Sequence, residues 1–194
     1  IGDRAKDMWI STFHSLCVRI LRRDIERIGY NRSFVIYDTQ DQLSLIKECI
    51  KECGLREDSF KPSSVLSAIS GAKDKLLNPK AFEARYFNDF RLSKISKVYD
   101  LYQRKLKSNN ALDFDDLIFK TVELLKTDEF VRDFYQRKFQ YVMVDEYQDT
   151  NHAQYVLINL LSEMHKNLCV VGDDDQSIYG WRGADIANIL DFEK

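Results

Sequence analysis

Carboxylates follow two apolar runs in the second half of the chain. Asp145 and Glu146 come directly after Tyr141–Val144, and Asp173–Asp175 come after Leu168–Val171. In an open α/β sheet, ligands bind beyond the carboxyl ends of the strands. An aspartate there can hold Mg²⁺ for phosphoryl transfer, and a neighbouring carboxylate can act as general base. We therefore predict that Asp145 binds the metal and the nucleotide and that Glu146 is catalytic; two acidic residues in an exposed loop are the alternative.

Polar and aromatic residues follow the second carboxylate run. Gln176 is neutral, so it can contact a γ-phosphate or the attacking water, and we predict both a catalytic and a cofactor-binding role for it. Tyr179 and Trp181 are two residues apart and project to the same side of an extended segment. Bases stack on such rings with roughly 1–3 kcal/mol each. Arg182 can pair with phosphate or stack, so these three residues predict a DNA-binding platform; a buried core position for the rings is the alternative.

The elements that would position these residues have an α/β pattern. The runs at 141–144 and 168–171 are continuously apolar, as in strands buried on both faces of a parallel sheet. A helical pattern follows each run, and this order favours an α/β unit. Met8–Phe13 is expected to form a short strand of the same sheet. The fold class is therefore predicted as α/β with a parallel sheet.

The stretch from about Tyr30 to Asn110 has helical patterns and no strong strand signal. Asp38 is expected to cap one helix, and Pro62 and Pro79 to begin two others. A long amphipathic helix then follows, because its apolar residues recur at spacings of three and four: Ile95, Val98, Tyr99, Tyr102 and Leu106. We expect a large all-helical insertion at 30–110, between α/β parts at 1–29 and 111–194.

The composition is that of an ordinary globular protein. The 194 residues are 44% hydrophobic and 31% charged, with a net charge of −2, which excludes a generally basic nucleic-acid wrapper but not a local basic groove. Four cysteines lack the spacing of a metal site, so we expect buried or half-buried free thiols in a reducing compartment. No apolar run approaches the roughly 20 residues of a membrane span, and no signal peptide is recognised.

Four stretches of the chain resemble the UvrD/Rep/PcrA family of superfamily 1 DNA helicases, most of all its members from low-GC Gram-positive bacteria. They are Ser11–Ser15, Leu112–Leu117, Val144–Asn151 and Val171–Ala184. The last two are highly specific together, and the resemblance covers essentially all 194 residues. It implies a partial RecA-like sheet of the P-loop NTPase type and a 3′-to-5′ DNA translocase driven by ATP and Mg²⁺.

The resemblance also implies roles for individual residues. Asp145 resembles the Mg²⁺-holding Walker B aspartate, Glu146 the general base and Gln176 the γ-phosphate sensor. Thr12 and His14 resemble a motif that contacts single-stranded DNA, and Tyr179 and Trp181, with Arg182 beside them, resemble the pair that stacks bases. Lys73, Lys75 and Lys80 of the insertion are candidates for contact with the DNA backbone.

Two parts of the family's machinery are not in this sequence. The chain has no Gly-Lys dipeptide, so the P-loop is missing, and the second motor domain is missing as well. We therefore expect an internal piece of a helicase, inactive alone, whose parent binds single-stranded DNA and single/double-strand junctions. The parent is expected to be bacterial, cytoplasmic and nucleoid-associated, with accessory replication or repair proteins as further partners. A stand-alone DNA-binding module without ATPase activity and a metal-dependent nuclease are the alternatives.

Overall fold

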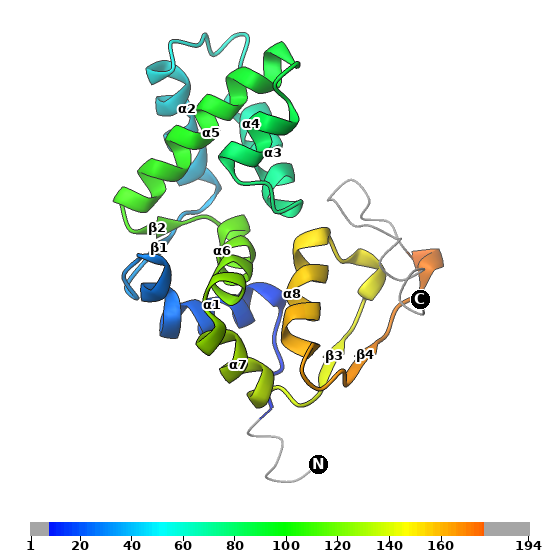
Figure 1. Cartoon of the computed structure of the whole chain (residues 1–194). Helices are drawn as coiled ribbons and strands as arrows, with labels where there is room; N and C mark the ends of the chain where they lie inside the picture. The colour runs from blue at the N-terminus through cyan, green and yellow to red at the C-terminus, as the bar shows by residue number, and fades with distance from the viewer. Residues whose placement is uncertain (1–7, 177–194) are drawn as a thin grey trace.

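The computed structural model describes residues 8–176, and its helices and strands form two packed regions (Figure 1). Helices α2–α5 lie together at one end of the molecule. Helices α1, α6, α7 and α8 lie at the other end with strands β3 and β4. Each region has its own buried apolar cluster, so the helical region has a core that is independent of β3 and β4.

The helical bundle consists of α2 (Thr39–Glu52), α3 (Pro62–Asp74), α4 (Pro79–Arg85) and α5 (Phe90–Ser108). The predicted cap is confirmed, since the Asp38 carboxylate accepts hydrogen bonds from the backbone N–H groups of Gln40 and Asp41. Pro62 and Pro79 occupy the first turns of their helices, where a missing N–H costs nothing. The apolar stripe predicted for α5 is buried along its whole length.

The chain enters and leaves the bundle through two very short strands. β1 (Val35–Ile36) pairs in parallel with β2 (Ala111–Leu112). Strands of two residues are too short to show any period, so the sequence pattern gave no sign of them. Asn110 supports the crossing, because its side-chain oxygen accepts a hydrogen bond from the Asn31 N–H at 2.8 Å.

The second region packs its helices around one core. It contains α1 (Phe13–Asp24), the 3₁₀ helix η2 (Ile25–Ile28), α6 (Phe114–Thr127), α7 (Glu129–Lys138) and α8 (His152–Ser162). α6 lies in the middle of this region and packs against α1, α7 and α8. Its N-terminal end points toward the bundle, so α6 is the element through which the two regions meet (Figure 1).

Strands β3 (Val142–Val144) and β4 (Leu168–Val170) pair in parallel, with Val142 opposite Leu168 and Val144 opposite Val170. With α8 between them in the chain, they confirm a parallel β–α–β unit. The prediction that both faces of these strands are buried is wrong. Tyr141 and Met143 are 76% and 73% exposed, because α8 covers one face and no described element covers the other.

The strand predicted at Met8–Phe13 is not found. Residues 8–12 have no regular structure, and α1 begins at Phe13, where the Thr12 side chain caps the helix. A strand needs a partner for its backbone groups, and this segment is separated from β3 by a cleft that both of them line. A RecA-like sheet thus remains a prediction beyond the two described pairs of strands.

Within residues 8–176 no helix is long and apolar enough to cross a membrane. All four cysteines are free. Burial raises the pKa of the Cys17 and Cys49 thiols to about 12, so they stay protonated at neutral pH. Cys169 is exposed, contrary to expectation, because it points to the uncovered face of β4.

Candidate active site

The first carboxylate pair lies at the carboxyl end of β3, as the sequence predicted. Asp145 and Glu146 are both exposed, and Asp145 Oδ1 accepts a hydrogen bond from the Glu146 N–H at 3.0 Å. Glu146 has a left-handed backbone, with φ of 50° and ψ of 44°. Residues other than glycine rarely adopt this conformation, and such strain is concentrated at functional sites.

Gln148 holds the Glu146 carboxylate. The Gln148 side chain is only 1% exposed. Its Nε2 donates a hydrogen bond to Glu146 Oε2 at 2.8 Å, and its Oε1 accepts one from the Asp173 N–H at 3.1 Å. A single buried amide therefore connects the tip of β3 to the tip of β4. The sequence analysis assigned Gln148 no role of its own, because only the pairing of β3 with β4 brings Asp173 within reach of it.

The segment after β4 is held by hydrogen bonds among its own residues. Asp173 Oδ2 accepts a hydrogen bond from Gln176 Nε2 at 2.7 Å, and Asp173 Oδ1 accepts one from the Asp175 N–H at 3.1 Å. Continuous polar contacts thus run from Gln176 through Asp173 and Gln148 to Glu146. The structure brings together three of the predicted site residues, Asp145, Glu146 and Gln176, whereas Tyr179, Trp181 and Arg182 lie outside the described residues.

Thr12 and His14 lie where α1 begins. The Thr12 hydroxyl caps the helix by accepting a hydrogen bond from the Ser15 N–H at 3.3 Å. His14 is half-buried, and burial lowers its pKa against the opposing charge of Asp115, so the ring is neutral at pH 7. A neutral imidazole offers a hydrogen bond or a stacking face rather than a positive charge.

Phe114 is a second aromatic residue at this position, and the sequence analysis did not single it out. Its ring meets that of His14 edge to face, with centroids 6.3 Å apart, and remains 49% exposed. An exposed phenylalanine next to a polar ring is a suitable surface for stacking a base. Phe114 is three residues before the buried Leu117, which is the spacing of an apolar stripe, so the sequence pattern gave no sign of its exposure.

A cleft of about 500 Å³ lies between the start of α1, with Thr12 and His14, and the tip of β3, with Asp145 and Glu146. It lies between residues 9–16 and β3, and its polar lining includes Thr12, His14, Asp145 and Glu146. Its walls are mostly apolar side chains from β3 and α8. Thr12 and His14, predicted to contact DNA, therefore border the same cavity as Asp145 and Glu146, predicted to act on a nucleotide.

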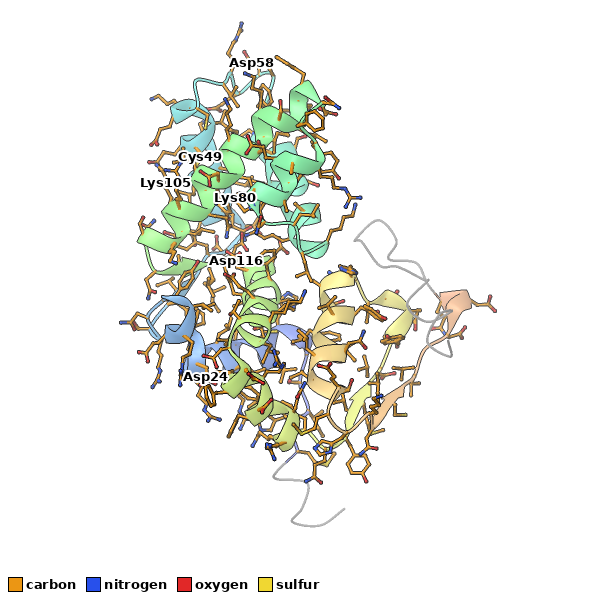
Figure 2. The ribbon with its side chains drawn as sticks, in the orientation of Figure 1. Asp24, Cys49, Asp58, Lys80, Lys105 and Asp116 are labelled. Atoms are coloured by element: carbon orange, nitrogen blue, oxygen red, sulfur yellow. The ribbon has the colours of Figure 1, made fainter. Side chains whose placement is uncertain are left out.

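One predicted DNA contact is wrong. Lys73 is only 1% exposed, and its Nζ lies 2.6 Å from Asp113 Oδ2 and 3.0 Å from Asp116 Oδ1. It cannot reach a DNA backbone, because the N-terminal end of α6 encloses it; Figure 2 shows Asp116 there, below the bundle. Lys75 and Lys80 are exposed, and their contact with DNA stays a prediction.

The donor set suits a magnesium–nucleotide complex better than a free metal ion. Within the described part of the chain, no group of three or more His, Cys, Asp or Glu side chains could hold a metal ion. Mg²⁺ needs only one or two protein carboxylates when substrate phosphates complete its shell. The exposed Asp145 carboxylate fits that role. A nuclease would require further convergent acids, which the described residues do not supply.

The chain is similar to known proteins along its whole length. All 194 residues match the model of the UvrD/REP helicase N-terminal domain. The chain is 58% identical to the ATP-dependent DNA helicase PcrA of Bacillus subtilis, 54% to that of Staphylococcus aureus and 53% to that of Staphylococcus epidermidis. Each match covers the whole chain but only 26% of the relative's length. The strand-tip carboxylates with their glutamines, and a family match along every residue, lead to one conclusion: this chain belongs to the UvrD/REP helicase N-terminal domain family.

Proposed function

We propose that this chain forms part of the motor of an ATP-dependent DNA helicase that moves 3′ to 5′ on single-stranded DNA. The observation that supports this most is the line of contacts from Gln176 to Glu146. It connects the residue expected to sense the nucleotide with the residue expected to activate water. The named relatives are ATP-dependent DNA helicases, and the described residues hold none of the additional acids that a nuclease would need.

Each site residue has a distinct role in this proposal. When bound, Mg-ATP supplies the phosphoanhydride whose hydrolysis drives movement. Asp145 would hold the metal, since its carboxylate is exposed at the strand tip. Glu146 would accept a proton from the attacking water, because its carboxylate lies at the strand tip and is held by Gln148. Gln176 would exchange its bond to Asp173 for one to the γ-phosphate.

Single-stranded DNA would lie across the surface formed by Thr12, His14 and Phe114. The neutral His14 ring and the exposed Phe114 ring offer stacking faces next to the cleft. Tyr179, Trp181 and Arg182 would continue this surface. Lys75 and Lys80, exposed on the bundle, would meet the duplex ahead of the junction.

The proposal includes the wider organisation. Residues 1–29 and 111–194 would belong to the first RecA-like motor domain, with residues 30–110 as its helical insertion. The P-loop and the second motor domain would come from other parts of a longer protein. We propose that this protein acts in the bacterial cytoplasm at the nucleoid, with replication or repair proteins as partners.

Replacement of Glu146 in the full-length protein tests the proposal. Glu146→Gln keeps the bond to Gln148 but removes the base. We expect ATP hydrolysis to fall by about 10²- to 10⁴-fold, while binding of a fluorescent ATP analogue stays unchanged. Glu83→Gln, on the exposed face of α4, is the matched control and should leave both unchanged.

The other outcomes are equally informative. Normal hydrolysis by the Glu146→Gln protein would remove Glu146 as general base. If the unaltered full-length protein binds oligonucleotides with no ATPase activity at all, the chain is a DNA-binding module and the motor proposal is wrong.

A further inference from the structure

The C-terminal end of α3 connects the bundle to the candidate active site. α3 is a bundle helix, with Val65, Ile69 and Ala72 in the bundle core. It also packs against α6 and α8, which belong to the other region. Its last two residues make these contacts: Lys73 bonds to α6, and Asp74 bonds to the residue that caps α8.

Lys73 fixes α3 to α6. Its ammonium group is enclosed by Asp113 and Asp116, the capping residue and the third residue of α6. The Tyr102 hydroxyl of α5 donates a further hydrogen bond to Asp113 Oδ2 at 2.9 Å. Burial lowers the pKa of Lys73, but the two carboxylates outweigh this and raise the pKa above its ordinary value, so the lysine stays charged. A buried ion pair with this geometry allows little change in the position of α3 on α6.

Asp74 fixes α3 to the segment that carries the catalytic carboxylates. Asp74 Oδ1 accepts a hydrogen bond from Asn151 Nδ2 at 2.7 Å. Asn151 is the residue directly after the loop Asp145–Thr150. It also caps α8, since its Oδ1 accepts a hydrogen bond from the Gln154 N–H and its own N–H donates to Gln154 Oε1, both at 2.9 Å. The oxygen and the nitrogen of its side-chain amide are therefore both hydrogen-bonded, which fixes the orientation of the amide.

Asn151 would cap α8 without Asp74, so the bond from its Nδ2 is not needed for the helix. The consequence of this bond is positional. It sets the end of the loop 145–150 against a helix of the bundle, while Gln148 sets the middle of the loop against β4. With the middle and the end of the loop both held, the Glu146 carboxylate has a defined place relative to the bundle.

We propose that Asp74 is a positioning residue: through Asn151 it holds the carboxylate loop Asp145–Thr150 in register with the helical bundle, so that a displacement of the bundle reaches the active site. Its effect on hydrolysis depends on the function proposed above, whereas its effect on the loop does not. Asp74 touches neither nucleotide nor DNA in this proposal and acts only through Asn151.

Two variants separate the hydrogen bond from the charge. Asp74→Ala removes the acceptor, whereas Asp74→Asn keeps a side-chain oxygen for Asn151. Asn151→Ser breaks the same bond from the other side and keeps a good helix cap. Glu83→Ala, on the exposed face of α4, serves as the control.

The first measurement is amide hydrogen exchange in the full-length protein. We expect exchange at residues 145–151 to rise by roughly tenfold in Asp74→Ala and in Asn151→Ser. It should stay at the wild-type level in Asp74→Asn and in Glu83→Ala, with α2 and α5 protected in all four. The Asp74→Ala/Asn151→Ser double variant should be no worse than either single one. Unchanged exchange at 145–151 in both Asp74→Ala and Asn151→Ser would overturn the proposal.

The second measurement is DNA-stimulated ATP hydrolysis. Misplacement of the loop should lower kcat by about 10- to 100-fold in Asp74→Ala, with KM for ATP unchanged and recovery in Asp74→Asn. A wild-type protein without ATPase activity would contradict the proposed function but not the exchange result. An active wild type whose kcat survives Asp74→Ala would contradict the role of Asp74 in positioning. If Asp74→Ala unfolds, Asn151→Ser decides the question.

Discussion

Gln148 Nε2 lies 2.8 Å from Glu146 Oε2, and this contact is the only side-chain hydrogen bond that the structure gives to the Glu146 carboxylate within residues 8–176. The Oε1 of the same amide accepts a hydrogen bond from the Asp173 N–H, so Gln148 lies between the ends of two parallel strands. Its burial makes both bonds strong and their loss costly.

Gln148→Ala should therefore affect both stability and activity. It leaves the Asp173 N–H without its acceptor and frees the Glu146 side chain. We expect a loss of roughly 1–3 kcal/mol in the free energy of unfolding, measured by urea denaturation. ATP hydrolysis by the full-length protein should fall as well. Gln40→Ala, at an exposed position of α2, is the control; equal stability of the two variants would contradict the structural role of Gln148.

Lys73→Met should be among the most destabilising single changes in this chain. It leaves Asp113 and Asp116 as buried carboxylates without their counter-charge. Removing one partner of a buried ion pair costs about 3–5 kcal/mol. Lys80→Met, on the exposed surface of α4, should change stability by less than about 0.5 kcal/mol. Thermal unfolding of both variants checks the difference, and a loss of similar size in each would show that Lys73 is not the anchor described.

Asp74 should make stability depend on pH. Burial, and after it the charge of Asp115, raises the pKa of Asp74 from 3.8 to about 7, against a smaller opposing effect of Lys75. The folded state thus holds a proton that the unfolded state releases. This contribution to stability is complete below about pH 4 and is lost as the pH rises to about 7. Asp74→Asn removes the titrating group but keeps the hydrogen-bond acceptor. Relative to the wild type, its free energy of unfolding should therefore increase as the pH rises from about 4 to about 7.

Denaturant unfolding of the wild type and of Asp74→Asn at several pH values checks this. The two curves should converge near pH 4 and separate toward pH 7, then run in parallel at higher pH. A constant difference across the range would mean that Asp74 has an ordinary pKa in the folded protein.

Phe114→Ala should weaken binding of single-stranded DNA. The exposed ring next to His14 offers a base a stacking partner worth about 1–3 kcal/mol. Fluorescence anisotropy with a labelled oligonucleotide measures the change in the full-length protein. Phe130→Ala is a matched control, because Phe130 is 82% exposed on α7, away from the cleft. Equal affinity of the two variants would remove Phe114 from the DNA surface.

Local features of the fold were predictable from the sequence. Caps such as Asp38 bond to backbone groups two or three residues away, so a short stretch of sequence is enough to predict them. The apolar stripe of α5 and the runs at β3 and β4 depend on the period of one element alone. For the same reason the positions of Asp145, Glu146 and Gln176 after their strands could be inferred directly.

The strand expected at Met8–Phe13 failed because a strand is stable only with a partner for its backbone, which a local pattern cannot supply. The exposed faces of Tyr141 and Met143 have a related cause, since burial depends on what packs against a strand and not on its own composition. The prediction for Lys73 failed because a lysine in sequence gives no sign of two carboxylates 40 and 43 positions later.

The sequence by itself thus determined several of the helices, the strands β3 and β4 and the chemical character of their tips, because each depends on residues a few positions apart. Only the tertiary structure decided how these parts are connected. The bond from Asp74 to Asn151 spans 77 residues, and the bond from Gln148 to Asp173 spans 25. Such contacts form only when whole elements pack together, and they are strong because this packing buries them.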